Sequence, residues 1–232
     1  MTPATPTTDA ALYRLMTWLS PTYPVGAFSY SHGLEWAVEA GDVTGRDALV
    51  SWLADILAHG GGRNDAILFA QAYRAVAKGD GAGLRHVAAL AVAWTASRER
   101  RLETTAQGAA FRIATQAAWA TPSFDMLADL PDDALAYPVA VAVAAAGHGV
   151  PLRAALGAFL QALAANLVSA GMRLIPLGQT DGQRALAALE PVVAATLAVA
   201  LHATLDDLGG AALGADLAAM LHETQYTRLF RT

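Results

Sequence analysis

The chain has 232 residues, a formal net charge of -5 and no cysteine. This length is enough for one large domain with a buried core. Without cysteine the chain has no disulfide, thiolate metal ligand or cysteine nucleophile, which is typical of a cytoplasmic protein, and it has no basic patch of the kind that binds nucleic acid.

Alanine dominates the hydrophobic composition. Hydrophobic residues make up 55% of the chain, and nearly half of them are its 55 alanines. Alanine is the best helix former, so the composition favours helices over bulky apolar surface. The longest apolar stretches, 134–147 and 192–201, are shorter than the roughly 18 to 20 residues of a membrane-spanning helix. The sequence therefore predicts a soluble protein without contact to a membrane.

The first residues, 1–8, have neither a basic start nor an apolar core. A secretory signal or transit peptide would show one or both. We therefore expect 1–8 to be a short disordered tail that precedes the folded domain.

The segment 20–35 reads SPTYPVGAFSYSHGLE and interrupts this helical background. Pro21 and Pro24 remove two backbone donors and Gly26 permits unusual backbone angles, so one helix must end here and another begin near Ser31. The segment presents many aromatic and hydroxyl side chains, namely Tyr23, Phe28, Ser29, Tyr30, Ser31 and His32. Glu35, in the first turns of the next helix, is the one acidic residue that stands out, and its simplest role is to interact with the helix N-terminus.

Helical periodicity covers almost all of the remaining chain. In 152–167, bulky residues recur at the spacing of a core-facing stripe, after a proline, Pro151, that can open a helix. Glycine and proline break the pattern at 41–45, 60–62, 79–83, 121–122, 131, 147–151, 176–182 and 209–210. These breaks predict an all-α fold of nine or ten helices in one compact domain, 9–221. Because its alanine-rich helices offer little bulky apolar area, we expect a second subunit to complete the surface of a homodimer.

Two later segments carry excess polar chemistry. The charged run 98–103 is most simply a solvated helix face with Arg100 and Glu103 paired. The segment 171–183 reads as a loop between helices, capped by Thr180 or Asp181, yet Gln179 and Gln183 add more amide groups than a cap needs. Arg173 shares a helix face with Ser169 and Gln161, which is most simply solvated.

The last residues, 222–232, combine aromatic, leucine and arginine side chains, types that anchor interfaces. From the residues alone, docking onto the chain's own body and binding to a partner are equally good readings.

Catalytic and metal chemistry have weak support. There is no Gly-x-Ser-x-Gly elbow and no His-Glu-x-x-His motif. Two carboxylate–imidazole pairs at helical spacing could build a metal site on two helices, which leaves an all-α metal-binding enzyme as the alternative function; the pairs are Asp55 with His59 and His202 with Asp206.

Three segments together resemble the urease accessory protein F family, UreF. They are SPTYPVGAFSYSHGLEWA near the start, ANLVSAGMRLIPLGQTDGQ in the second half and HETQYTRLFR at the end, in the family's order. The segments 99–108 and 137–140 are also similar. The chain departs from the pattern at Ala136, where a histidine is frequent, and at Leu221, where an arginine is common, so any role of those two side chains is in doubt.

The resemblance implies an all-helical, homodimeric, non-catalytic chaperone for nickel insertion into apo-urease. It implies binding to UreD (also called UreH) and to the GTPase UreG, without a cofactor or a permanently bound metal of its own. On that basis we assign to UreD the tail residues Tyr226, Arg228, Leu229, Phe230 and Arg231, which would become ordered on binding. We assign to the GTPase or the dimer cleft Gly26, Phe28, Ser29, Tyr30, Ser31, Glu35, Arg173, Gln179, Asp181 and Gln183.

Overall fold

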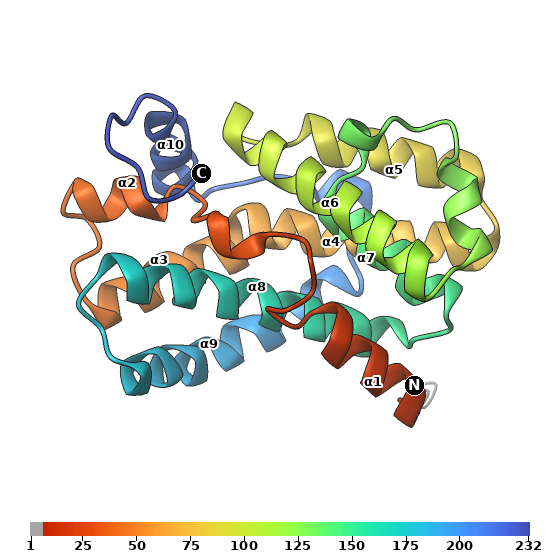
Figure 1. Cartoon of the computed structure of the whole chain (residues 1–232), viewed down its shortest axis with the longest axis horizontal. Coiled ribbons are helices and arrows are strands. Elements are labelled where there is room, and N and C mark those ends of the chain that lie inside the picture. The colour runs from red at the N-terminus through yellow and green to blue at the C-terminus, as the bar shows by residue number, and fades with distance from the viewer. Residues whose placement is uncertain (1–6) are drawn as a thin grey trace.

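A computed structural model of the chain describes residues 7–232, apart from the side chain of residue 132. Among these residues there are ten α-helices, four short 3-10 helices and no strand (Figure 1). The α-helices are α1 (Asp9–Trp18), α2 (Leu34–Glu39), α3 (Arg46–His59), α4 (Gly61–Lys78), α5 (Gly81–Ala93), α6 (Arg98–Ala118), α7 (Tyr137–Gly147), α8 (Leu152–Leu174), α9 (Gln179–Ala200) and α10 (Leu213–His222). The 3-10 helices are η1 (Ala27–Ser29), η2 (Pro122–Leu127), η3 (Asp132–Ala134) and η4 (Leu205–Asp207). The prediction of an all-α fold with nine or ten helices is confirmed.

The core centres on α7 and α4. Every residue of α7 from Pro138 to Ala145 is buried, as expected for a helix that is apolar all round. α4 packs against α7 and contacts α3, α5, α8 and α9. α6 crosses the front of this pair in Figure 1, and α8 and α9 lie beside α3 on the other side. The helices on both sides of α4 and α7 therefore contribute to one continuous apolar core.

An aromatic cluster fixes the start of the opening segment. Trp18, at the end of α1, packs edge-on against Phe111 of α6 with ring centroids 6.2 Å apart. Tyr23 stacks at an angle on the same ring at 5.4 Å, and its hydroxyl hydrogen-bonds the hydroxyl of Thr115 at 2.8 Å. Trp18 and Tyr23 therefore both pack against α6, which fixes the position of the segment that follows them.

The helix boundaries correct several expectations. The helix after the opening segment begins at Leu34 rather than near Ser31. Pro151 is the cap of α8 rather than its first residue, and Gly178 caps α9, so Thr180 and Asp181 lie inside its first turn. Within the predicted disordered segment 1–8, residues 1–6 lie outside the described residues and Thr8 caps α1 by accepting a hydrogen bond from the Ala11 amide.

Two helices, α8 and α9, have the length and mean hydropathy of a membrane span, which the unbroken apolar stretches did not predict. The reason is that isolated glycine, serine, asparagine or charged residues interrupt these helices without lowering their mean hydropathy much. In the most apolar part of each helix, 50% of α8 and 22% of α9 is buried inside the fold. Core helices of soluble proteins can have the same length and mean hydropathy, so α8 and α9 are weak evidence for a membrane span.

Candidate partner-binding site

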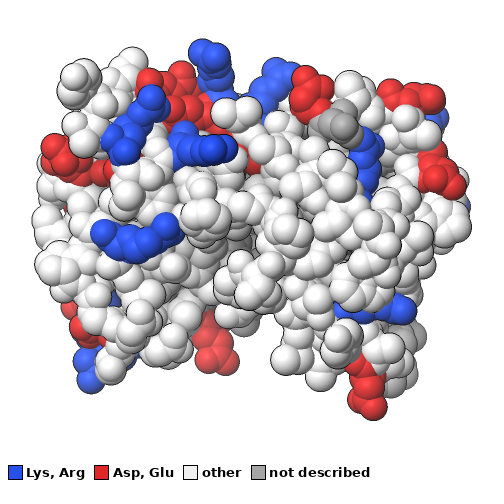
Figure 2. Space-filling model, viewed as in Figure 1, with Lys and Arg blue, Asp and Glu red and all other residues white. Residues whose placement is uncertain are grey.

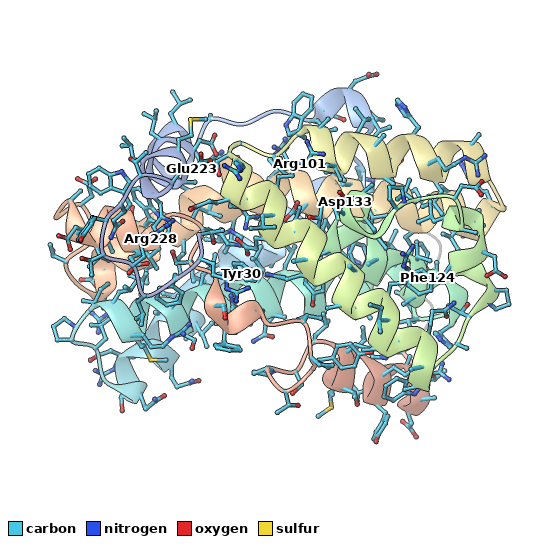
Figure 3. The ribbon with its side chains drawn as sticks, turned by 45° about the horizontal axis from the view of Figure 1, so that its top comes forward. Tyr30, Arg101, Phe124, Asp133, Glu223 and Arg228 are labelled. Carbon is cyan, nitrogen blue, oxygen red and sulfur yellow. The ribbon has the colours of Figure 1, made fainter. Side chains whose placement is uncertain are left out.

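The tail after α10, 223–232, is folded back across the opening segment of the chain (Figure 3). Its backbone pairs with that of the segment after η1: the Arg231 amide donates to the Ser29 carbonyl at 2.9 Å, and the Ser31 amide donates to the Thr232 carbonyl at 2.9 Å. The Ser31 hydroxyl donates to the same carbonyl. Ser31 and Thr232 are 201 residues apart in sequence, so distant segments are joined here like a short pair of strands.

Glu35 holds the middle of the tail. Its carboxylate accepts a hydrogen bond from the Leu229 amide at 2.6 Å and from the Phe230 amide at 2.9 Å. The same carboxylate lies 3.0 Å from Nε2 of His222. Glu35 is buried, and a buried carboxylate is stable only when its oxygens have such donors. The first turn of α2 therefore serves as an anchor for the chain's own tail.

His222 connects two carboxylates where α10 ends. Its ring is fully buried, with Nε2 on Glu35 and Nδ1 on Glu99 of α6 at 2.6 Å. Both ring nitrogens of His222 therefore face a carboxylate, one from α2 and one from α6. Arg228 of the tail adds a second ion pair to Glu99 at 2.7 Å. Together these contacts tie the start of the tail to both α2 and α6.

Glu103, one turn beyond Glu99 on α6, holds the end of the tail. Its carboxylate accepts from the Thr232 hydroxyl at 2.9 Å, lies 2.7 Å from Nε2 of His32 and pairs with Arg100. Burial alone would raise its pKa, but Arg100 and His32 outweigh burial and hold the pKa of Glu103 at about 2. The pKa of His32 is lowered, mainly by burial and by Arg100. Glu103 is therefore an ionised group inside the protein.

The turn before α2 explains how α10 reaches this place. His32 and Gly33 both have left-handed backbone angles, with φ of 56° and 77°. A Cβ atom on Gly33 would lie 2.5 Å from the backbone nitrogen of Ala219, so only glycine lets α10 approach this closely. The turn thus places His222, at the end of α10, against Glu35.

The apolar side chains of the tail point partly into the protein and partly into solvent. Phe230 is 4% exposed, and the Arg173 guanidinium lies 4.3 Å from the centroid of its ring, a cation–π contact. Leu229, its neighbour, is 66% exposed and Tyr226 is fully exposed. The docked tail therefore turns one aromatic ring inward and presents the other apolar side chains to solvent.

Charged residues of both signs gather along the upper edge of the molecule in Figure 2, the edge that holds α10 and the tail in Figure 1. The centre of the same face is largely uncharged. The tail thus lies at a charged edge of a face whose centre is largely uncharged.

The structure brings together some of the residues that the sequence analysis placed on two separate surfaces. Ser29, Ser31, Glu35 and Arg173 all contact the tail. The expectation that the tail becomes ordered only on binding differs from the structure, in which the chain's own carboxylates hold it. The side chains of Tyr30, Ser31, Glu35 and Phe230 are buried in this conformation, so their expected role at a binding surface stays a prediction.

The remaining predicted residues lie elsewhere or face solvent. Asp181 forms ion pairs with Arg46 at 3.6 Å and Arg184 at 3.2 Å, at the start of α9. Gln179 and Gln183 are exposed on the same turn and have no recorded contact with the tail. Gly26 has a left-handed backbone before η1, Phe28 is 67% exposed, and Arg231 is exposed.

The sequence analysis missed Glu99, Glu103, His32 and His222. It read the run 98–103 as a solvated face, which is wrong because Glu103 is buried and Arg100 nearly so. The spacing of Glu99, Glu103 and Gln107 at i, i+4 and i+8 places three polar residues on one face of α6. That stripe of carboxylate and amide side chains at helical spacing was the available signal.

The alternative metal site is not assembled. Asp55, His59, His202 and Asp206 are all exposed. Across residues 7–232, no group of three or more His, Asp or Glu side chains is placed to share a metal ion. The four residues proposed for a metal-binding enzyme therefore give that alternative no support.

The family model and the similar proteins all match one family. The UreF family model matches residues 43–190. A urease accessory protein UreF from Rhodopseudomonas palustris (strain HaA2) is 61% identical over 96% of this chain and 94% of its own length. One from Bradyrhizobium diazoefficiens is 58% identical over 96% of this chain and 92% of its own length.

Proposed function

Because the chain belongs to the UreF family of urease accessory proteins, we propose that it acts as a non-catalytic scaffold for nickel insertion into apo-urease. In this proposal it binds UreD (UreH), recruits and regulates the GTPase UreG, and works in the cytoplasm as a homodimer. Nickel is then the cargo of the assembled complex and not a cofactor of this chain.

The docked tail is the observation that carries the proposal. An ordinary terminus is weakly held, whereas this one is held by three carboxylates from two helices, Glu35, Glu99 and Glu103. Such anchoring fixes Tyr226 and Leu229 in exposed positions, at no further ordering cost when a partner binds. We assign this face to UreD, with Arg228 and Arg231 beside the two apolar anchors.

The second proposed surface is the exposed part of the opening segment. Phe28, on η1, and Gly26 before it lie within reach of solvent, beside the buried residues that hold the tail. We assign this surface, together with the exposed amides of Gln179 and Gln183, to the dimer cleft or the GTPase. An exposed phenylalanine beside a polar rim is the kind of residue that anchors an interface.

Co-purification with UreD from the same host tests the proposal. The unaltered chain should capture UreD, and deleting residues 227–232 should abolish capture while leaving the helical circular dichroism unchanged, because those residues lie outside the helices. A second variant separates contact from docking: Tyr226→Ala with Leu229→Ala should weaken capture although the tail stays docked. Full capture of UreD by the truncated chain would overturn the assignment of the tail.

A further inference from the structure

A cavity of about 350 Å³ lies between α4, the end of α5 and α10. Its walls are largely apolar, with Ile56, Leu68 and Leu217 among them. Trp94, just after α5, lines it as well and is 45% exposed. On α10 the exposed residues Leu213 and Met220 also line the cavity. The cavity thus opens beside the helix that leads into the docked tail.

Two carboxyl groups, Asp65 of α4 and Asp216 of α10, face this apolar space. Within residues 7–232, neither carboxyl group forms a hydrogen bond or an ion pair. Arg100 is the one Lys or Arg among the described residues that line the cavity, and it is already paired with Glu103. Three carboxyl groups therefore share one guanidinium.

Asp65 lines two neighbouring cavities. A second cavity of about 330 Å³, on the side of the opening segment, shares His32, Asp65 and Arg100 with the first. Burial raises the pKa of Asp65 to about 6 against the opposing effect of Arg100, and burial also raises the pKa of Asp216. Both side chains are partly exposed. A carboxylate beside apolar walls without a donor is disfavoured in its charged form, so a bound cation would stabilise that form.

We propose that this cavity receives a lysine or arginine side chain from the protein partner that binds beside the docked tail. The identity of that partner rests on the proposed function. The preference of the pocket for a cationic side chain rests on its lining residues alone. A long aliphatic stem suits the apolar walls, its cationic head suits Asp65 and Asp216, and Trp94 offers an aromatic face to the same cation. α10 carries both the cavity wall and the tail, so one partner can reach both.

A bare metal ion fits the cavity less well. Metal sites usually gather three or more ligands, and the described residues bring no three His, Asp or Glu side chains together. Apolar side chains such as Ile56 and Leu68 offer nothing to a hydrated ion but contact the methylene groups of a long side chain.

A side-chain analogue tests the chemistry of the pocket. The ¹⁵N-labelled full chain is titrated with n-butylguanidinium chloride at pH 7.5, and with n-butylurea, a neutral probe of nearly the same shape. The guanidinium should shift the Trp94 indole signal saturably and leave that of the fully buried Trp18 unchanged. The urea probe should bind at least tenfold more weakly, because it cannot pair with a carboxylate. Equal binding of the two probes, or no binding of either, would overturn the proposal.

Asp65→Asn provides the matched variant. It keeps the shape of the side chain and removes an unpaired charge, so the protein should fold at least as well as before. The variant should bind n-butylguanidinium about tenfold more weakly, whereas Asp55→Asn, on the exposed face of α3, should leave the affinity unchanged. An unchanged affinity for Asp65→Asn would contradict the role of that carboxylate.

A partner experiment then decides the source of the cation. Asp65→Asn with Asp216→Asn should weaken capture of the tail-binding partner at least tenfold, without releasing the tail. Undiminished capture by this double variant would overturn the proposal even if the small probe binds. Failure of the unaltered chain to capture any urease accessory partner would instead contradict the proposed function, and the probe titration would still decide the chemistry of the cavity.

Discussion

Replacement of Glu35 by alanine should release the tail without unfolding the helical body. The variant removes the acceptor for the Leu229 and Phe230 amides and one of the two carboxylates on His222. Each of these hydrogen bonds is to a charged group. The helices have their own apolar core, so the cost should appear as undocking of the tail and not as global unfolding.

The magnitude follows from the two amide hydrogen bonds to Glu35. A hydrogen bond to a charged group contributes about 1.5 to 3 kcal/mol net. Two amide bonds therefore supply about 3 kcal/mol at the lower limit, and the released amides regain water, which prevents a larger penalty. A change of about 3 kcal/mol corresponds to roughly a 150-fold change in the docking equilibrium.

Hydrogen exchange at the two amides measures this equilibrium directly. Exchange at Leu229 and Phe230 should accelerate by roughly two orders of magnitude in Glu35→Ala. Glu39→Ala, on the same helix but exposed and away from the tail's hydrogen bonds, should leave both rates unchanged. Equal rates in Glu35→Ala and the unaltered chain, with the far-ultraviolet spectrum preserved, would show that the carboxylate does not hold the tail.

Three further perturbations follow from the same structure. Gly108→Ala should lower the urea midpoint markedly, by more than about 2 kcal/mol of stability, because its Cβ would collide with the backbone carbonyl of Leu135; an unchanged midpoint would refute that close approach. Phe230→Ala should expose the tail to limited proteolysis, because the Phe230 ring is buried. Leu229→Ala should not, because the Leu229 side chain is already exposed. Equal cleavage of the two variants would contradict this reasoning. The pKa of Glu103 is lowered in the fold to about 2 from 4.5, so its contribution is present above pH 4.5 and is lost as the pH falls toward 2. The difference in melting temperature between the unaltered chain and Glu103→Gln should therefore shrink between pH 5 and pH 2.5, and a constant difference would contradict the assignment.

The helical architecture was predictable because glycine and proline mark most of the connections. Breaks at 41–45 and 147–151 separate α2 from α3 and α7 from α8 as expected. The break between α5 and α6 was missed because Trp94 to Ser97 contain neither residue; Ser97, which caps α6 by accepting from the Arg100 amide, was the only local sign.

The site was only partly predictable because its contacts join distant segments. Glu35 stands out in the sequence, but its partners Leu229 and Phe230 lie 194 and 195 residues away, and no local pattern connects them. The same holds for His222, whose two carboxylates come from α2 and α6. The chemistry of each segment was visible, whereas the fact that one segment docks on the other required the fold.

Urease maturation in cells tests the central claim most directly. A host that lacks its own UreF-family protein is complemented with the unaltered chain or with Tyr226→Ala and Leu229→Ala combined, and urease activity and nickel content are measured at equal expression. Both quantities should be restored by the unaltered chain and stay near background with the double variant, although hydrogen exchange shows its tail docked. Full maturation with the double variant would contradict the claim that the exposed side of the docked tail binds the partner.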